Sequence, residues 1–103
     1  MSPPVIVIAR LKARADKRET LIAGAVACIA ATRQETGCIA YDCHESLTEP
    51  GRFVFVEQWQ DRAALETHMT LPHLKAFVAL AVPCLAEVPT IEAISGGDRW
   101  QLM

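Results

Sequence analysis

The sequence predicts a small α+β domain of the ferredoxin-like class, in which a four-stranded antiparallel sheet carries two helices on one face. Segments of period-two alternation and segments of helical spacing follow one another in the order β, α, β, β, α, β (βαββαβ), which is the split βαβ arrangement. The chain has 103 residues, 51% of them hydrophobic, and fits one domain over residues 1–103. Several predicted strands are apolar on both faces, so the sheet needs cover on both sides.

The first strand and the first helix follow from alternation and capping signals near the N-terminus. Residues 5–13 (VIVIARLKA) alternate between two mainly apolar faces, as expected of a strand. Asp16 can cap a helix, because Glu19 three residues later completes the spacing of a capping box. We expect this helix to run to about Glu35, with Gly37 as its C-cap.

An antiparallel hairpin is predicted next. The second strand covers residues 38–47 (CIAYDCHESL), and the turn formers at 48–51 (TEPG) lead into a third strand at 53–59. One face of this third strand combines three aromatic side chains with a carboxylate: Phe53, Phe55, Glu57 and Trp59.

The second helical region is interrupted at its centre. Asp61 can cap a short helix, and Pro72 suits the first turn of a second one. Pro83 ends that helix, because proline lacks the N–H that the helical hydrogen bond requires. Residues 88–94 (VPTIEAI) form the fourth strand, and we expect a short tail after it that carries Trp100.

The face of the sheet without helices is predicted to bind a second copy of the chain. Its apolar residues need cover, and two identical sheets packed face to face supply it. A small domain has limited capacity to bury such a surface on its own. We therefore expect a homodimer formed through the open sheet face.

The composition excludes several other partners. The net charge is −2, and the basic residues form no cluster beyond the short run Arg10 to Arg18, so nucleic acid is not an expected partner. No apolar run approaches the roughly 18 residues of a membrane span, and the N-terminus lacks the order of a signal peptide. We expect a cytoplasmic protein that does not bind membranes.

The four cysteines are interpreted as thiols, because their spacing matches no disulfide framework. Cys38 and Cys43 lie an odd number of positions apart on one predicted strand. They should point to opposite faces and hold no metal together unless the strand has a bulge. No metal site is predicted.

Three motifs identify a family resemblance: G-C-x-x-Y from Gly37 to Tyr41, E-x-W-x-D-x-x-A-L-x-x-H from Glu57 to His68, and P-H-x-x-x-F from Pro72 to Phe77. With them the chain resembles the antibiotic biosynthesis monooxygenase family over nearly its whole length. This resemblance implies a dimeric α/β barrel. Members include cofactor-independent monooxygenases of quinols and anthrone-like polyketides, haem-degrading enzymes and an isomerase of a sugar phosphate.

The haem-degrading branch does not fit this sequence. That branch resembles the present chain but uses an Asn, a Trp and a haem-ligating His. The chain contains no asparagine, His68 stands where the Trp would fall, and Val78 stands where the axial His would fall. The resemblance therefore implies no cofactor.

His68 is the predicted catalytic residue. The resemblance implies a pocket between the sheet and the helices, and an imidazole there can take a phenolic or enolic proton at neutral pH. The alternative is a packed, hydrogen-bonded core histidine, because His68 shares an apolar helix face with Leu65 and Met69.

The remaining predicted site residues have binding or structural roles. The expected substrate-binding residues are Tyr41, Phe55, Trp59, His73 and Phe77, although an aromatic side chain can equally serve as core. Glu57 is predicted to be a buried structural carboxylate that needs a partner. Arg10, Lys12 or a backbone group across the dimer are the candidates.

The predicted function is cofactor-independent oxidation of a small aromatic, quinol or anthrone-like substrate with molecular oxygen. Such chemistry needs a base, a flat apolar pocket and exclusion of water. Two alternatives remain open on the same scaffold. One is a sugar-phosphate isomerase, for which Arg10, Lys12 and Lys75 would bind the phosphate, and the other is a dimer that binds a small ligand without reaction.

Overall fold

A computed structural model describes residues 3–103 and confirms the α+β, ferredoxin-like fold. Five strands form one antiparallel sheet in the order β2-β3-β1-β4-β5. The strands are β1 (Val5–Lys12), β2 (Cys38–Glu45), β3 (Arg52–Trp59), β4 (Thr90–Ser95) and β5 (Asp98–Gln101). The helices are α1 (Arg18–Thr32), α2 (Arg62–His68) and α3 (Pro72–Ala81), with two 3-10 turns, η1 (Ala15–Lys17) and η2 (Val82–Cys84).

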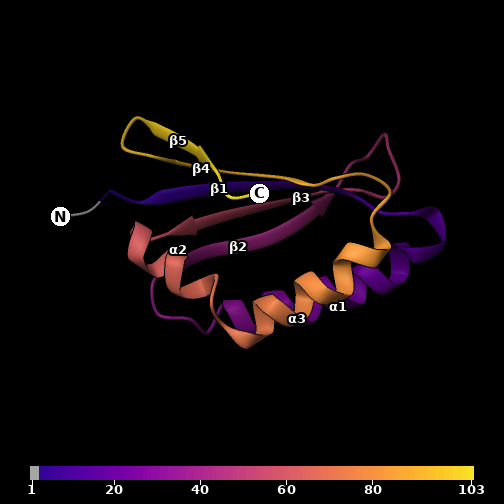
Figure 1. The fold of residues 1–103 in the computed structure, drawn as a ribbon, viewed down its shortest axis with the longest axis horizontal. Coiled ribbons are helices and arrows are strands. Elements are labelled where there is room, and N and C mark those ends of the chain that lie inside the picture. The colour runs from indigo at the N-terminus through magenta and orange to yellow at the C-terminus, as the bar shows by residue number, and fades with distance from the viewer. Residues whose placement is uncertain (1–2) are drawn as a thin grey trace.

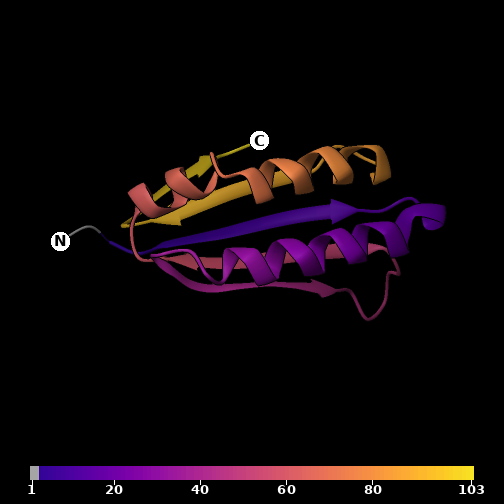
Figure 2. The same cartoon turned by 90° about the horizontal axis from the view of Figure 1, so that it is seen from below.

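All three helices lie on one side of the sheet (Figure 1). Seen from that side, α1 lies toward the β2–β3 half and α3 toward the β4 half, and the two helices pack side by side (Figure 2). The other side of the sheet carries no helix among the described residues. In the same part of the chain, no helix combines the length and the apolar character that crossing a membrane requires.

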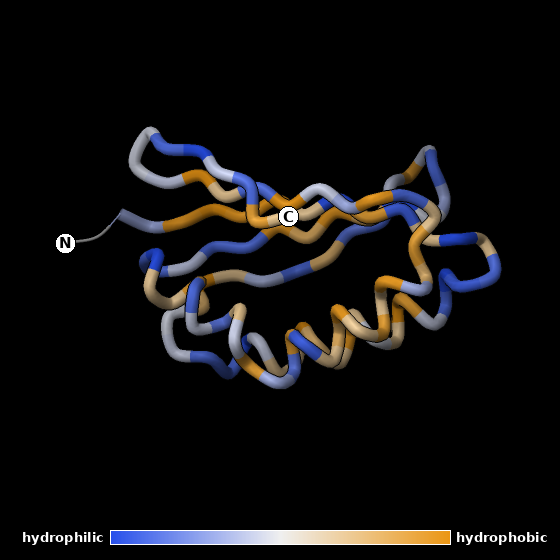
Figure 3. Tube along the Cα trace, viewed as in Figure 1, coloured by the Kyte–Doolittle hydropathy of each residue, from blue (hydrophilic) through white to orange (hydrophobic). Residues whose placement is uncertain are grey.

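The predicted alternation of the central strands is confirmed. One face of β1 is buried under the helices and consists of Val5, Val7, Ala9 and Leu11. The residues of β3 that pair with them, which are every second residue from Phe53 to Trp59, are buried in the same way. Figure 3 shows hydrophobic stretches along these strands and along the helices, whereas the connection from β1 to α1 is hydrophilic. The core therefore lies between the sheet and one helical layer.

The opposite face of the sheet exposes an apolar patch. Five side chains that share this face by their cross-strand pairing make it: Ile6, Ile8, Val54, Val56 and Ile94. Val56 keeps 43% of its surface exposed, and the other four are half-buried. We call this set the open-face patch.

The first helix begins and ends differently from the prediction. Asp16 does not cap it, because the residue lies in η1 and its carboxylate faces Arg14 at 3.5 Å. The α-helix starts at Arg18 after an N-cap without a side-chain hydrogen bond, and it stops at Thr32 rather than near Glu35. Gly37 has φ +91°, as expected of a reversal after a helix, but four residues beyond the C-cap at Arg33.

Strand β5 was missed by the sequence prediction, which left it as a tail. Gly96 and Gly97 both have positive φ, as a two-residue hairpin turn requires, and they connect β4 to β5. The dipeptide Gly-Gly between Ser95 and Asp98 is a recognised hairpin signal. The prediction of a tail does not use this Gly-Gly signal.

The prediction that Cys38 and Cys43 face opposite sides is wrong, because β2 contains a bulge. Cys38 pairs with Trp59, the register then shifts, and Tyr41 pairs with Glu57 and Cys43 with Phe55. The extra residue in β2 compensates for the odd spacing, so both thiols face the helices.

Asp61 caps α2 as predicted. Its Oδ1 accepts a hydrogen bond of 2.8 Å from the backbone N–H of Ala64. We expect Asp61→Ala to lower the free energy of unfolding by about 1 kcal/mol, measured by urea denaturation. Asp61→Asn keeps an oxygen acceptor and should lose much less. Equal losses in the two variants would show that the cap does not contribute.

Candidate active site

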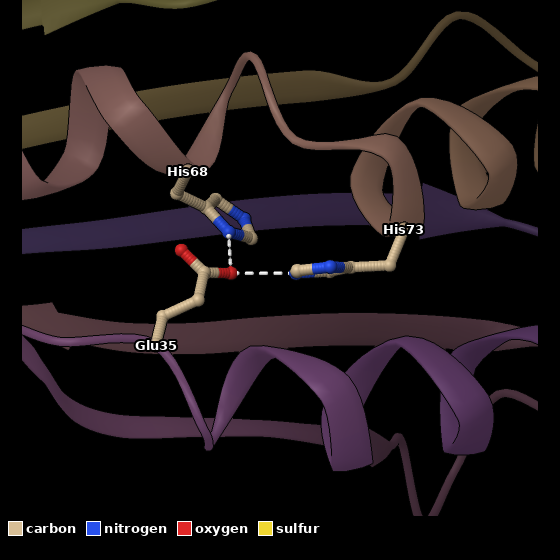
Figure 4. A group of neighbouring side chains, drawn as sticks. All are labelled: Glu35, His68 and His73. Atoms are coloured by element: carbon tan, nitrogen blue, oxygen red, sulfur yellow. Dashed lines mark hydrogen bonds and ion pairs between the residues drawn. The ribbon is translucent and has the colours of Figure 1, made fainter.

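Three side chains from different elements meet at a buried carboxylate (Figure 4). Glu35 comes from the turn after α1, His68 ends α2, and His73 lies in the first turn of α3. The Oε2 atom of Glu35 lies 2.7 Å from Nδ1 of His68 and 2.6 Å from Nε2 of His73. The side chains of Glu35 and His68 are 9% and 1% exposed, and that of His73 is 26% exposed.

This geometry fixes the tautomer of both imidazoles. A carboxylate oxygen only accepts, so His68 donates from Nδ1–H and His73 donates from Nε2–H. A neutral His68 then keeps a lone pair on Nε2, the ring nitrogen that does not contact Glu35. Burial lowers the pKa of His68, and the neighbouring Glu35 opposes this shift in part. His68 is therefore held as a neutral base, with a carboxylate behind it.

An apolar cavity of about 90 Å³ lies beside His68, between the sheet and the helices. Its walls include side chains from β2, β3, α2 and α3: Tyr41, Phe55, Glu57, Leu65, His68 and Phe77. Met69 and Met103 also border it, and both are exposed enough to move, at 38% and 58%. Four of the six predicted catalytic and substrate-binding residues thus share one cavity: His68, Tyr41, Phe55 and Phe77.

Trp59 and His73 lie behind this cavity rather than in its wall. Trp59 is fully buried and packs on His68, with ring centroids 4.6 Å apart. His73 reaches Glu35 instead of the cavity. Each residue contacts one member of the His68–Glu35 pair, and neither is among the residues that line this cavity.

Tyr41 also belongs to the core. Its ring stands edge-on to His68 at 5.4 Å, and its hydroxyl lies 3.7 Å from the Cys28 thiol. Burial raises the pKa of the Tyr41 hydroxyl far above its usual range. Tyr41 therefore stays protonated at neutral pH, and it lines the cavity.

Glu57 has a different partner from those expected. Its Oε1 accepts a hydrogen bond of 3.0 Å from Nε1 of Trp59. Arg10 and Lys12 are on the other face of β1, where they pair with Glu92 and Glu49. Burial is the main cause that raises the pKa of Glu57 to about 7, with a smaller contribution from the negative charge of Glu35.

Glu35 is the site residue that sequence reasoning missed. It was assigned only to the end of the first helix. Glu35 lies two residues before Gly37, the first residue of the G-C-x-x-Y motif. Gly37 has a positive φ, which reverses the direction of the chain after α1. A Cβ at Gly37 would lie 2.7 Å from the Cβ of Ala64, so this turn packs closely against α2. That close approach brings Glu35 to His68.

A second apolar cavity, of about 190 Å³, lies between α1 and the sheet. Leu21, Ile29 and Phe53 are among its lining residues, and Phe55 borders both cavities. Its ionisable lining groups are Cys43 and Glu45. Burial raises the pKa of the Cys43 thiol to about 12, and Arg18 holds Glu45 in an ion pair at 2.6 Å. Neither group can serve as a neutral-pH base.

The fold and the site define a small ferredoxin-like α+β protein with a histidine–carboxylate pair beside a small apolar cavity. The family described as antibiotic biosynthesis monooxygenase matches residues 4–80. The chain belongs to this family, which confirms the resemblance found in its motifs.

Relatives share this family and fold. "Uncharacterized protein sll1783" of Synechocystis is 37% identical over 86% of the chain, which spans 60% of that relative's length. "Putative monooxygenase Rv0793" of Mycobacterium tuberculosis is 44% identical over 71% of each protein. Its solved structure has a TM-score of 0.85 at 36% identity, covering 92% of this chain and 96% of that one. A crystal structure described as antibiotic biosynthesis monooxygenase has a TM-score of 0.84 at 31% identity, covering 87% and 95%.

Proposed function

We propose that the protein is a monooxygenase that oxidises a small aromatic, quinol or anthrone-like molecule with molecular oxygen, without a metal or an organic cofactor. The observation that carries the proposal is His68 in the wall of an apolar cavity, with Glu35 bonded to its Nδ1, which leaves Nε2 as the nitrogen that can accept a proton. A base oriented by a carboxylate in this way is a recurrent arrangement for proton abstraction. The family and the names of its relatives support oxygenation.

His68 acts in the first step of the proposed mechanism. Its Nε2 takes the acidic proton of the substrate, and the imidazolium that forms is stabilised by its Nδ1–H bond to Glu35. Phe55 and Phe77, whose centroids are 5.5 Å apart, hold the substrate ring in the cavity. Apolar walls keep water away from the anion.

The electron-rich anion then reacts directly with oxygen. For an anthrone-like substrate, a CH₂ group and O₂ become a carbonyl group and one water molecule. One oxygen atom enters the carbonyl and the other leaves as water, and the substrate supplies all the electrons. The protein therefore needs no external reductant.

The cavity must widen to admit a quinol or an anthrone-like molecule. Its volume of about 90 Å³ is less than the ~150 Å³ of a buried apolar cavity that holds benzene. Met69 and Met103 are flexible side chains at its border, and their movement can enlarge it. Arg10, Lys12 and Lys75 do not line it, which disfavours a sugar-phosphate substrate.

Oxygen uptake tests the proposed function. Purified protein, treated with a chelator, is supplied with a panel of reduced quinols and anthrone-like phenols. We expect uptake above the spontaneous rate for at least one of them, with one substrate oxygenated per O₂ consumed. Ligand binding by the folded protein without uptake would instead support the non-enzymatic alternative.

We also propose that the open-face patch binds the same patch of a second copy. The supporting observation is a continuous set of apolar side chains on the sheet face against which no helix of residues 3–103 packs. Charged and polar residues surround it, among them Arg10, Asp42 and Arg99. An apolar centre with a polar rim is typical of protein interfaces.

Sedimentation equilibrium at micromolar concentration tests this interface. The wild-type protein should be a dimer, and Val56→Glu should weaken it by at least about tenfold, because it places a charge in each half of a dry interface. Val26→Glu is the matched control, since Val26 is 60% exposed on α1, on the other side of the sheet. A wild-type monomer, or equal effects of the two variants, would contradict the proposed interface.

A further inference from the structure

We propose that Glu35, His68 and His73 form a binding site for one divalent transition-metal ion of the zinc class, which replaces the two hydrogen bonds that now join them. The ligand atoms are Oε2 of Glu35, Nδ1 of His68 and Nε2 of His73. Two imidazoles and one carboxylate are an established ligand set for such ions.

The three donor atoms already converge. All of them lie within 4.8 Å of one another, and both nitrogens point at the same carboxylate oxygen (Figure 4). Tetrahedral zinc with bonds of roughly 2.0–2.2 Å needs donors roughly 3.3 Å apart. The present separations of 2.7 and 2.6 Å from Oε2 must therefore open by less than 1 Å.

The position of each ligand is well determined. Glu35 is held by the turn at Gly37, which packs closely on α2, and His68 is clamped between Trp59 and Tyr41. His73 is the exposed member, so solvent can reach the cluster from its side. A water molecule can then complete the coordination as the fourth ligand.

The charge of the cluster also favours a cation. Glu35 is largely buried, and its only ion-pair partners among the described residues are the two histidines. With both imidazoles neutral, the cluster carries one negative charge in a poorly hydrated place. A divalent cation would compensate it directly.

Binding of the metal changes the tautomer of His68. A neutral imidazole has one N–H, so a metal on Nδ1 leaves that proton on Nε2. The nitrogen at the cavity would then donate a hydrogen bond and could no longer accept a proton. A bound ion of this class would therefore prevent His68 from acting as a base, a consequence that rests on the proposed function. The metal site itself rests on the geometry alone.

Calorimetry with Zn²⁺ on the purified, chelator-treated full chain tests the site. We expect one ion per chain, with binding weakened at least about 100-fold in Glu35→Gln and in His73→Ala. Loss of a ligand should exceed the 10- to 100-fold effect of losing an outer hydrogen-bond partner. His44→Ala is the matched control, because His44 is an exposed histidine on β2, outside the cluster. This variant should bind Zn²⁺ as tightly as the wild type does.

Cobalt replaces zinc as a spectroscopic probe of the ligands. Visible bands of four- or five-coordinate Co²⁺ without thiolate charge transfer would support the site, whereas thiolate bands would assign the ion to the cysteines. Circular dichroism confirms that each variant is folded, and His73 is only partly buried, so its alanine variant should fold. No binding, or binding that survives both Glu35→Gln and His73→Ala, would overturn the proposal.

Metal binding and oxygen uptake are measured separately. If Zn²⁺ binds at the cluster and no substrate is oxidised, the metal site stands and the proposed function fails. If substrate is oxidised and Zn²⁺ at a bound stoichiometry does not inhibit it, the switching consequence fails. If Zn²⁺ inhibits the wild type and the His44→Ala variant, and a chelator reverses the inhibition of the wild type, the result would support both the metal site and the proposed function.

Discussion

His68→Ala should lower the turnover of oxygen uptake by about a hundredfold or more. General bases contribute a factor of about 10² to 10⁴, and His68 offers the free nitrogen at the cavity beside Glu35. The loss should appear mainly in kcat, because the apolar walls that bind the substrate remain. The measurement is initial oxygen uptake against substrate concentration for the wild type and the variant.

A structural role of His68 predicts other results. Thr67→Ala is the matched control, since Thr67 is exposed at the same end of α2, and it should retain wild-type turnover. Added imidazole should restore part of the activity of His68→Ala, because a free base can enter the space left by the side chain. Unchanged turnover in the folded His68→Ala variant would show that His68 is a packed core histidine rather than the catalytic base.

The inward placement of several cavity-lining residues could be predicted from the sequence, because it follows from local periodicity. Phe55 and Glu57 share the inner face of β3 by simple alternation, and Phe77 faces inward by helical spacing from Leu74. These patterns depend on neighbours within a few residues, so a single sequence contains them. His68 was found through the motif and lies where the motif implies.

The parts missed depend on contacts between distant segments. Glu35 and His68 are 33 residues apart, and nothing near Glu35 in the sequence indicates its partner. The bulge in β2 likewise has no local signal, yet it turns Cys38, the first residue of that strand, toward the helices. The partner of Glu57 is an exception, because the indole N–H of Trp59 lies only two residues away, whereas the predicted candidates were Arg10, Lys12 or a backbone group across the dimer.

Glu57→Gln should abolish most of the decrease in unfolding free energy that the wild-type protein shows between pH 5 and pH 8. Burial raises the pKa of Glu57 from 4.5 to about 7. Between these values the native state binds a proton that the unfolded chain releases, so the unfolding free energy falls as pH rises. The two pKa values give a loss of about 2 to 3 kcal/mol over this range.

Glutamine keeps the hydrogen bond and removes the charge. Its amide oxygen can still accept from Nε1 of Trp59, so the variant should resemble the wild type at pH 5 and exceed it in stability at pH 8. Urea denaturation at one fixed protein concentration measures both proteins across this range, which excludes effects of any dimerisation equilibrium.

Glu45→Gln is the matched control for the sign of this effect. The hydrogen bond from Arg18 lowers the pKa of Glu45 to about 2. Its contribution to stability is complete above pH 4.5 and is lost only as pH falls toward 2, so Glu45→Gln should leave the slope between pH 5 and pH 8 unchanged. If Glu57→Gln also leaves the slope of unfolding free energy against pH unchanged, Glu57 titrates near its ordinary pKa. Its carboxylate is then charged at neutral pH. Because a second negative charge beside Glu35 would favour a cation there, the same titration also indicates how strongly the cluster attracts one.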